Sequence, residues 1–204
     1  MKILDYIKLI LLFIFFLVAL NCARKKDSLG MDDEIRVICS ETDEPLIRDY
    51  LTEVFDDTIY TPAPEPLFKL VFSRPAYYQD LKRYAQVIVA SVDRDNSNSG
   101  FRLVQKLLPD NQLNIDSNDN PVFLTRDLHA KDQVYVVINA IDKEHLFRNI
   151  NKNKDILQGY YDEQFKLRGS RFLFNDNQIE YEKKINMDYG WSIKIPWGWE
   201  IIRN

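Results

Sequence analysis

The sequence has few of the residues that most metal sites use. It contains two cysteines, Cys22 and Cys39, and two histidines, His129 and His145, in 204 residues. The histidines belong to no HExxH pattern and to no Cys-His spacing of the kind that zinc requires, so no metal site is predicted. Both histidines are expected to have structural roles.

Motifs for nucleophilic catalysis and phosphate binding are also missing. The sequence has no GxSxG, no SxxK and no glycine-rich phosphate loop. No catalytic residue and no cofactor site is therefore predicted. Glu65 and Asp57 could be imagined as paired carboxylates of a hydrolase, but nothing in the sequence indicates that they are buried or close together.

An excess of positive charge is absent as well. The net charge is −4, and residues 1–21 carry Lys2, Lys8 and Asp5, so their removal would change it to −5. Phosphate backbones are bound by clustered Lys and Arg side chains. Nucleic acid is therefore excluded as a partner.

One long apolar run is present near the start of the chain. It extends from Leu9 to Leu20 and follows Lys2 and Lys8. A membrane-spanning helix needs about 20 apolar residues, whereas the apolar part of a secretory signal needs roughly 7 to 15. The run therefore predicts a lipoprotein signal peptide over residues 1–21, and an uncleaved signal anchor is the alternative.

The residues after this run resemble a lipobox, Ala19-Leu20-Asn21-Cys22. The leucine stands one place later than usual, and Asn21 replaces the usual Gly, Ala or Ser. The motif favours lipid on Cys22, which would anchor an exported protein to a membrane of the cell envelope; inner and outer membrane are both left open. Cys39 would then have no intrachain partner, and its strand-like surroundings predict a buried thiol.

The first half of the mature chain alternates strands and a helix. Residues 22–33 are polar and aperiodic, which is typical of a flexible tether. A strand is expected from Glu34, and a helix from Asp43 to about Phe55. Two further strands, residues 68–72 and 86–92, are expected to pair antiparallel.

The second half continues this alternation. An amphipathic helix is expected over residues 101–108, a strand over residues 133–140 and a long helical stretch from Asp142. The fold class is therefore α+β, a ferredoxin-like β-α-β-β-α-β sandwich with a long C-terminal helical segment and a terminal strand. Residues 34–186 would form one domain, and residues 187–204 a strand-like tail.

Three segments follow one another along the chain: PEPLFKL at residues 64–70, HAKDQVYVVINA at 129–140 and YGWSIKIPWGW at 189–199. In this order they resemble domain-of-unknown-function family 4837, a group of bacterial envelope lipoproteins. The resemblance implies an envelope location and two related α+β halves, of which this chain would hold the first and the opening strand of the second. It implies no catalytic residue.

Two loops alternate oxygen-bearing side chains in a way that suggests calcium. These are Asp93, Asp95 and Ser97 in one loop and Asp116, Asn118 and Asn120 in the other. Neither has the Gly at position six and the Glu at position twelve of an EF-hand loop. Turns closed by Asp and Asn side chains are the preferred interpretation, and a weak calcium site is the alternative.

The aromatic residues leave open a recognition surface. The candidates are Tyr77, Tyr78, Tyr84, Trp191, Trp197 and Trp199. If exposed, they would indicate recognition, and if buried, packing; packing is favoured for the set. Trp191, Trp197 and Trp199 are kept as the candidate partner surface.

These features predict a cellular location rather than a biochemical activity. The protein is interpreted as a membrane-anchored envelope protein with a non-catalytic recognition or assembly role and an envelope protein or glycan as partner. The alternative is an envelope hydrolase that acts on glycan or peptide through acidic residues in a cleft.

Overall fold

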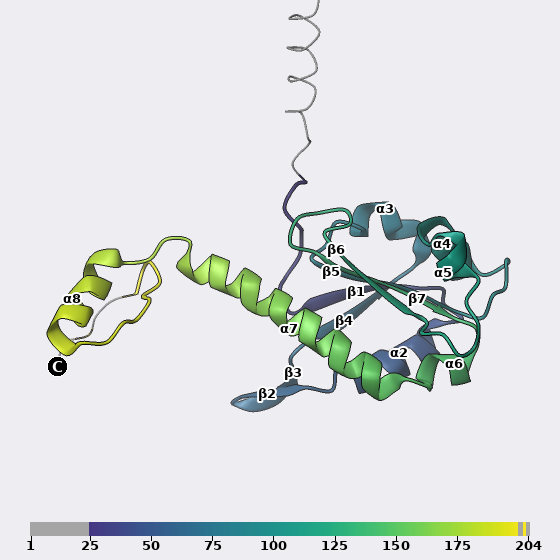
Figure 1. The fold of residues 1–204 in the computed structure, drawn as a ribbon, viewed down its shortest axis with the longest axis horizontal. Coiled ribbons are helices and arrows are strands. Elements are labelled where there is room, and N and C mark those ends of the chain that lie inside the picture. The colour runs from purple at the N-terminus through teal and green to yellow at the C-terminus, as the bar shows by residue number, and fades with distance from the viewer. Residues whose placement is uncertain (1–24, 200–201, 203–204) are drawn as a thin grey trace, which may run out of the picture.

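A mixed sheet with helices on both faces forms the centre of the protein (Figure 1). The computed structural model describes residues 25–199 and 202. The elements in chain order are β1 (Glu34–Ile38), α2 (Glu44–Val54), β2 (Thr58–Thr61), β3 (Ala63–Pro66), β4 (Lys69–Ser73), η1 (Pro75–Tyr77), α3 (Tyr78–Leu81), β5 (Gln86–Val92), α4 (Ser99–Leu107), α5 (Asp110–Leu113), β6 (Val122–Arg126), β7 (Val134–Ala140), α6 (Lys143–Phe147), α7 (Ile150–Phe174) and α8 (Ile179–Tyr189).

The central sheet is mostly parallel. Its strand order is β4-β1-β5-β7-β6, in which β6 runs antiparallel to β7 and the other neighbours are parallel. Every residue of β5 and β7 is buried, as expected for central strands of a parallel sheet with both faces covered. The strands β2 and β3 form a separate antiparallel hairpin.

The mixed composition and the long C-terminal helix are confirmed, but the ferredoxin-like topology is not. The expected antiparallel pairing of residues 68–72 with residues 86–92 is wrong, because β1 lies between β4 and β5 and is parallel to β4 and β5. The connection explains the difference. Residues 75–81 fold as η1 and α3, which return the chain to the end of the sheet where β4 began, so β5 starts in the same direction.

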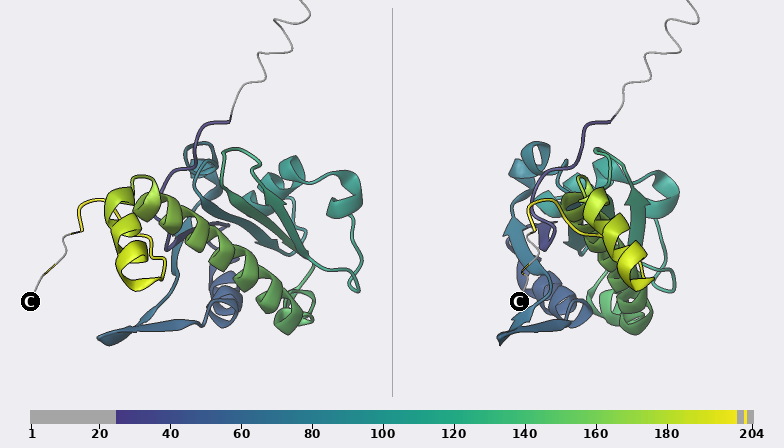
Figure 2. Two further views of the ribbon diagram at one scale, coloured as in Figure 1. Left: turned by 60° about the vertical axis from the view of Figure 1, so that its left-hand side comes forward. Right: turned by 90° about the vertical axis from the view of Figure 1, so that its left-hand side faces the viewer.

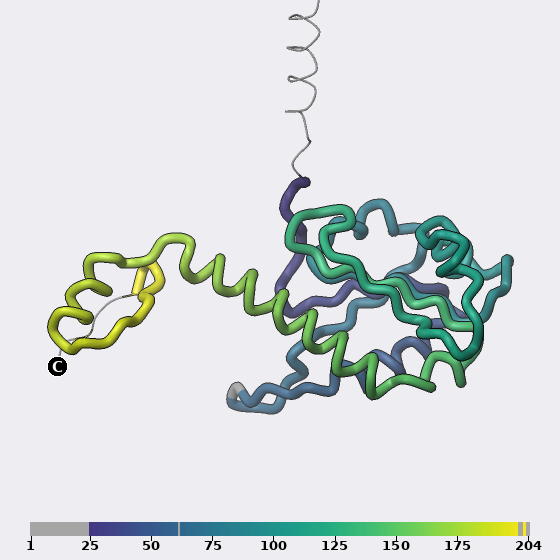
Figure 3. The backbone as a smooth tube through the Cα atoms, viewed as in Figure 1, coloured from purple at the N-terminus to yellow at the C-terminus, as the bar shows by residue number. Residues whose placement is uncertain are grey.

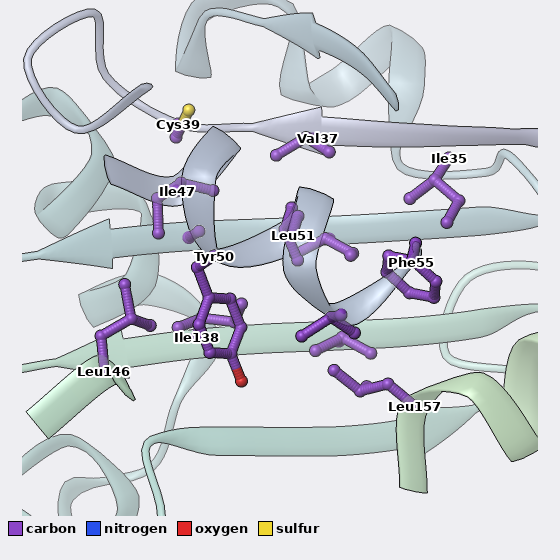
Figure 4. Close-up of a cluster of buried hydrophobic side chains, with 14 of the residues drawn as sticks. Ile35, Val37, Cys39, Ile47, Tyr50, Leu51, Phe55, Ile138, Leu146 and Leu157 are labelled. Carbon is purple, nitrogen blue, oxygen red and sulfur yellow. The ribbon is translucent and has the colours of Figure 1, made fainter. Parts of the chain in front are cut away.

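One core layer lies between the sheet and helices α2, α6 and α7 (Figure 4). Helix α2 contributes Ile47, Tyr50 and Leu51, and the Tyr50 ring meets that of Phe147 edge to face at 5.5 Å. Leu157 of α7 is fully buried against the same layer. A fully buried side chain of this size contributes roughly 1.5–3 kcal/mol, so this layer is a major source of stability.

The opposite face of the sheet is covered by α3, α4 and α5. Helix α4 buries Leu103 and Val104, which pack in one cluster with Val89 of β5 and Val137 of β7. The amphipathic helix expected near residues 101–108 is therefore present. Because helices cover both faces, the apolar residues of β5 are continuous rather than alternating.

The segment before β1 lies along the amino ends of the parallel strands. The N–H of Leu29 donates to the carbonyl of Arg83 at 2.9 Å, and the N–H of Ala85 donates to the carbonyl of Leu29 at 2.8 Å. These bonds hold part of the segment 22–33, which the sequence predicts as a flexible tether, against the domain. Cys22 and residues 1–21, which the sequence predicts as a signal peptide, lie outside the described residues.

Helix α7 crosses the domain and extends beyond it toward a small C-terminal unit, residues 175–199 (Figure 2). Helix α8 ends at Gly190, whose φ of 74° reverses the chain. The following residues fold back toward α8 (Figure 3). The N–H of Gln178 donates to the carbonyl of Ile195 at 2.9 Å. The strand expected within residues 187–204 is absent from their described part.

Candidate functional site

A cavity of about 810 Å³ lies at the carboxyl ends of β1, β4 and β5. Residues 40–43, 74–76 and 97–99 form most of its wall. Within the sheet, β4 lies on one side of β1 and β5 on the other, so the chain after β1 passes first to one neighbour and then to the opposite one. Open parallel sheets bind ligands where the connections diverge in this way, because the loops leave a crevice there.

Asp43 is the buried carboxylate of this cavity, with only 6% of the residue exposed. It stands at the start of α2, but its carboxylate does not cap that helix. Oδ2 instead accepts hydrogen bonds from the amide of Asn98 at 3.0 Å and from the hydroxyl of Ser91 at 3.4 Å. The Asp43 N–H donates to the hydroxyl of Ser40 at 3.1 Å. A buried charge needs such partners.

Asn98 connects Asp43 to helix α4. Its Oδ1 caps α4 by accepting from the N–H of Gly100 at 2.7 Å and from the N–H of Phe101 at 3.3 Å. Its Nδ2 donates to Asp43. One amide side chain thus satisfies the first turn of α4 and a carboxylate from the loop after β1.

Gly100 lets α4 approach the ends of β1 and β5 closely. A Cβ at this position would lie 3.1 Å from the backbone nitrogen of Ser40 and 3.3 Å from the carbonyl oxygen of Ala90. These neighbours are backbone atoms, which cannot move aside as a side chain can. The two loops of the cavity are therefore packed so closely that a Cβ at this position would require these backbone atoms to shift by a few tenths of an ångström.

The cavity wall is rich in carboxylates. Its acidic residues are Glu41, Asp43, Asp93 and Asp95, and its cation, Arg74, is paired with Glu41. Hydrogen bonds from the hydroxyl and the N–H of Ser97 lower the pKa of Asp95, so this group stays ionised. The wall favours ligands that donate hydrogen bonds or carry positive charge, and disfavours phosphate.

Cys39 precedes the cavity loop but does not take part in the site. The residue is buried in the core layer beneath α2. Burial, followed by the charges of Glu44 and Asp43, raises the pKa of its thiol to about 12. A neutral, buried thiol is not a nucleophile, which confirms the sequence-based interpretation.

Comparison with known protein families identifies the family to which this chain belongs. The model of a domain of unknown function, DUF8532, matches residues 28–168. The chain belongs to the DUF8532 family. No match was found among curated proteins or among solved structures.

The resemblance to family 4837 is wrong, because the model of a different family, DUF8532, matches residues 28–168. Two of its three segments, residues 64–70 and 129–140, lie inside the DUF8532 match. The first contains most of hairpin strand β3 and the start of β4, and the second contains β7 with the residues that lead into it. Short apolar strand patterns preceded by a proline or by polar residues occur in many proteins, so they do not identify one family.

The tryptophans that the sequence predicts as a partner surface lie beyond the region matched by DUF8532. Trp191, Trp197 and Trp199 are 53%, 77% and 65% exposed. Packing, which was favoured for the aromatic set, is therefore wrong for these three. Tyr77 is also exposed, whereas Tyr78 is buried.

Both histidines of the DUF8532 region have structural partners. The Nδ1 of His145 accepts from the N–H of Ile141 at 3.1 Å, so Nε2 carries the proton and donates to the carbonyl of Asp119 at 2.9 Å. The Nε2 of His129 lies 2.9 Å from the hydroxyl of Tyr78. These contacts agree with the structural roles expected for both.

The loops considered for calcium use their polar side chains within the chain. Asp95 accepts from the N–H of Ser97 at 2.8 Å, and Asp119 accepts from the N–H of Asp116 at 2.9 Å. Within residues 25–199 and 202, no three His, Cys, Asp or Glu side chains form a group that could hold a metal ion. In the same part of the chain, no helix is both long and apolar enough to cross a bilayer.

The paired carboxylates that the sequence suggested lie away from the cavity. Glu65 lies in the exposed hairpin strand β3, opposite Ile59. Asp57 is exposed before β2, where its carbonyl accepts from the N–H of Leu67 at 2.9 Å. The structure brings together Asp43 and Asn98 instead. The sequence predicts Asp43 as a helix-start residue but does not single out Asn98, and their contact depends on the strand order.

Proposed function

We propose that this protein is a lipid-anchored component of the cell envelope that recognises a small polar ligand and catalyses no reaction. The anchor would be lipid on Cys22, as the sequence motif favours. The ligand would occupy the cavity at the carboxyl ends of β1, β4 and β5. The observation that carries the proposal is the wall of that cavity, in which carboxylate and hydroxyl oxygens outnumber cations.

The chemistry of the wall limits the class of ligand. Asp93 and Asp95 are exposed to the cavity, and Arg74 is engaged by Glu41. Hydrogen bonds to a charged acceptor contribute about 1.5–3 kcal/mol each. A ligand with several hydroxyl or ammonium groups fits such a wall, so we assign an amino sugar or a short glycan as the ligand class.

A hydrolase acting on glycan or peptide is the second candidate, because the cavity is concave and holds several carboxylates. Such an enzyme needs one carboxyl group that stays protonated near neutral pH to act as the acid. The lowered pKa of Asp95 removes it from that role. Asp43 is held by Asn98 and Ser91, so recognition is better supported than hydrolysis.

Titration calorimetry of the purified full-length protein tests the ligand class. The probes are the glucosamine trimer, which carries ammonium groups, and the N-acetylglucosamine trimer, which carries neutral amides. We expect the first to bind more tightly because the wall is acidic. Release of sugar monomers during the incubation would favour the hydrolase, and binding of neither trimer would contradict the proposal.

Asp93→Asn is the variant that reports on the cavity. Asp93 has a φ of 77°, which asparagine also tolerates, so the substitution removes the charge without straining the backbone. Loss of one charge-assisted contact should weaken binding about tenfold. Asp127→Asn is the matched control, since Asp127 has a φ of 55° and is not part of the cavity wall. Equal weakening by both variants would contradict the assignment.

Metabolic labelling with an alkyne fatty acid tests the anchor. We expect label on the wild-type protein and on Cys39→Ala, whose cysteine is buried in the core. We expect none on Cys22→Ala. Label that survives Cys22→Ala would refute lipidation at this position.

A further inference from the structure

We infer that the C-terminal unit, residues 175–199, lies on the membrane surface and places its tryptophans in the lipid–water interface. The inference rests on the proposed anchor at Cys22 and adds a second membrane contact to it. The partner that we propose for this unit is a lipid bilayer rather than a protein. Three features carry the inference: the exposure of the aromatic residues, their position in the fold and the charge of the unit.

Large apolar side chains are exposed throughout this unit. The three tryptophans of the chain, Trp191, Trp197 and Trp199, are all more than half exposed, and Met187 and Tyr189 are 79% and 70% exposed. Monomeric soluble proteins rarely leave many such residues together in water. Tryptophan and tyrosine concentrate at membrane interfaces, where an apolar ring meets a polar edge.

The unit is attached at the end of the domain that the anchor would hold. Arg168, near the end of α7, donates to the hydroxyl of Ser28 at 2.6 Å and to the carbonyl of Gly30 at 3.0 Å, and it pairs with Asp32. The last turns of α7 are thus bonded to the segment that leads back toward Cys22. Residues 25–33, drawn in purple, lie at the amino ends of the strands, and α7 extends beyond the domain on this side (Figure 1).

The chain between the anchor and the domain is short. The N–H of Lys131 donates to the carbonyl of Lys26 at 2.9 Å, so Lys26 is already fixed to the domain. The four residue steps from Cys22 to Lys26 span at most about 14 Å. A lipid on Cys22 would therefore keep the amino ends of the strands near the bilayer, and the end of α7 with them.

The charge of the unit favours the interface over an ionic partner. Residues 175–199 contain four acidic residues and three lysines, so they are close to neutral. An acidic or basic protein surface would find little charge to pair with. None of the described helices is suited to cross a bilayer, so the contact would be interfacial, with the rings at the level of the head groups.

Quenching of tryptophan emission tests this placement, because all three tryptophans of the chain belong to the unit. The full-length protein, purified from membranes, is reconstituted in vesicles of phosphatidylethanolamine and phosphatidylglycerol with plain or brominated acyl chains. We expect a blue shift on reconstitution and loss of most of the emission with brominated chains. Added salt should change neither result, because the unit is nearly neutral.

A reporter at the other end of the sheet is the control. In a chain with all three tryptophans changed to phenylalanine, Tyr77→Trp places one indole at an exposed position beside the cavity. This reporter should keep its emission in brominated vesicles, because the carboxyl ends of the strands would face away from the bilayer. Equal quenching of this reporter would overturn the orientation.

The remaining outcomes separate the inference from the anchor. If the protein floats with the vesicles but its native tryptophans are not quenched, the inference fails and the anchor stands. If the tryptophans are quenched but no fatty-acid label is found, the membrane contact stands and the anchor fails. A blue shift that depends on protein concentration and not on brominated lipid would show that copies of the protein cover the tryptophans, and would overturn the inference.

Discussion

The side-chain amide of Asn98 donates a hydrogen bond of 3.0 Å to the carboxylate of Asp43, 55 positions earlier in the chain. The bond joins the loop after β1 to the start of α4, and both segments line the cavity. Because Asn98 also caps α4, the stability of that helix and the shape of the cavity depend on one side chain.

Asn98→Ala should lower the free energy of unfolding by about 1–3 kcal/mol, because it removes a helix cap and a hydrogen bond to a carboxylate. Urea unfolding measures this. Asn96→Ala is the control, since Asn96 only accepts a surface hydrogen bond from Gln105; it should change stability by less than about 0.5 kcal/mol. Similar losses for the two variants would show that Asn98 has no special role.

Gly100→Ala and Gly159→Ala should have opposite effects. At Gly100 the added Cβ meets backbone atoms of Ser40 and Ala90, whereas at Gly159 in α7 it meets nothing within 4 Å. We expect destabilisation by about 1–3 kcal/mol at Gly100 through overpacking, and stabilisation by about 0.5–1 kcal/mol at Gly159. Thermal unfolding of the two variants measures these changes in stability. Stabilisation at both sites would contradict the close approach of α4.

Stability should fall as the pH drops through the range in which unfolded histidine takes up a proton, near pH 6.5. Burial, and then the charges of Lys82 and Lys25, lower the pKa of His129. The unfolded chain therefore binds this proton at a higher pH than the folded chain does, and acid favours unfolding. His129→Gln should reduce the loss of stability between about pH 7.5 and about pH 5.5. Parallel curves for the two proteins would exclude this contribution.

Arg168→Gln should loosen the segment before β1 without unfolding the domain. Arg168 holds Ser28 and Gly30, while the N–H of Leu29 bonds to Arg83. Hydrogen exchange at the amides of Ser28 and Leu29 should accelerate about tenfold or more, since a hydrogen bond from a charged group contributes about 1.5–3 kcal/mol.

Arg126→Gln is the matched control for this exchange experiment. Arg126 pairs with Glu163 of α7, and both side chains are exposed at the surface of the domain. Loss of such a surface pair costs little. Acceleration of the same two amides by Arg126→Gln would mean that the effect reflects general loosening rather than release of the segment.

Local patterns predicted the individual elements well. Asp142 was expected to begin a helix, and its carboxylate accepts from the N–H of His145 at 2.7 Å. Strand β6 was missed, because it follows a loop rich in Asp, Asn and Ser, and its residues are only partly buried or exposed. Its pattern was too weak to stand out from the preceding loop.

The arrangement of the strands could not be read from these patterns. The continuous apolar run of β5 is compatible with several sheets, and the choice between β1 and β4 as its neighbour depends on packing across the whole layer. The same limit applies to the site. Asp43 is predicted to begin a helix, whereas Asn98 precedes the predicted start of its helix at residue 101, and their contact exists only once β1 and β5 lie side by side.

The position of β7 has a consequence for the order in which the protein can fold. It lies between β5 and β6 in the sheet, yet it is the last of the five strands to be synthesised. Until residue 140 has left the ribosome, the largest parallel pairing of the sheet has no second strand, and the apolar face of β5 stays open. The sheet is therefore completed late in synthesis, and pairing of parallel strands that are far apart in the chain is slow. For most of its synthesis the nascent chain would lack this pairing, and its exposed apolar strands could be bound by a chaperone.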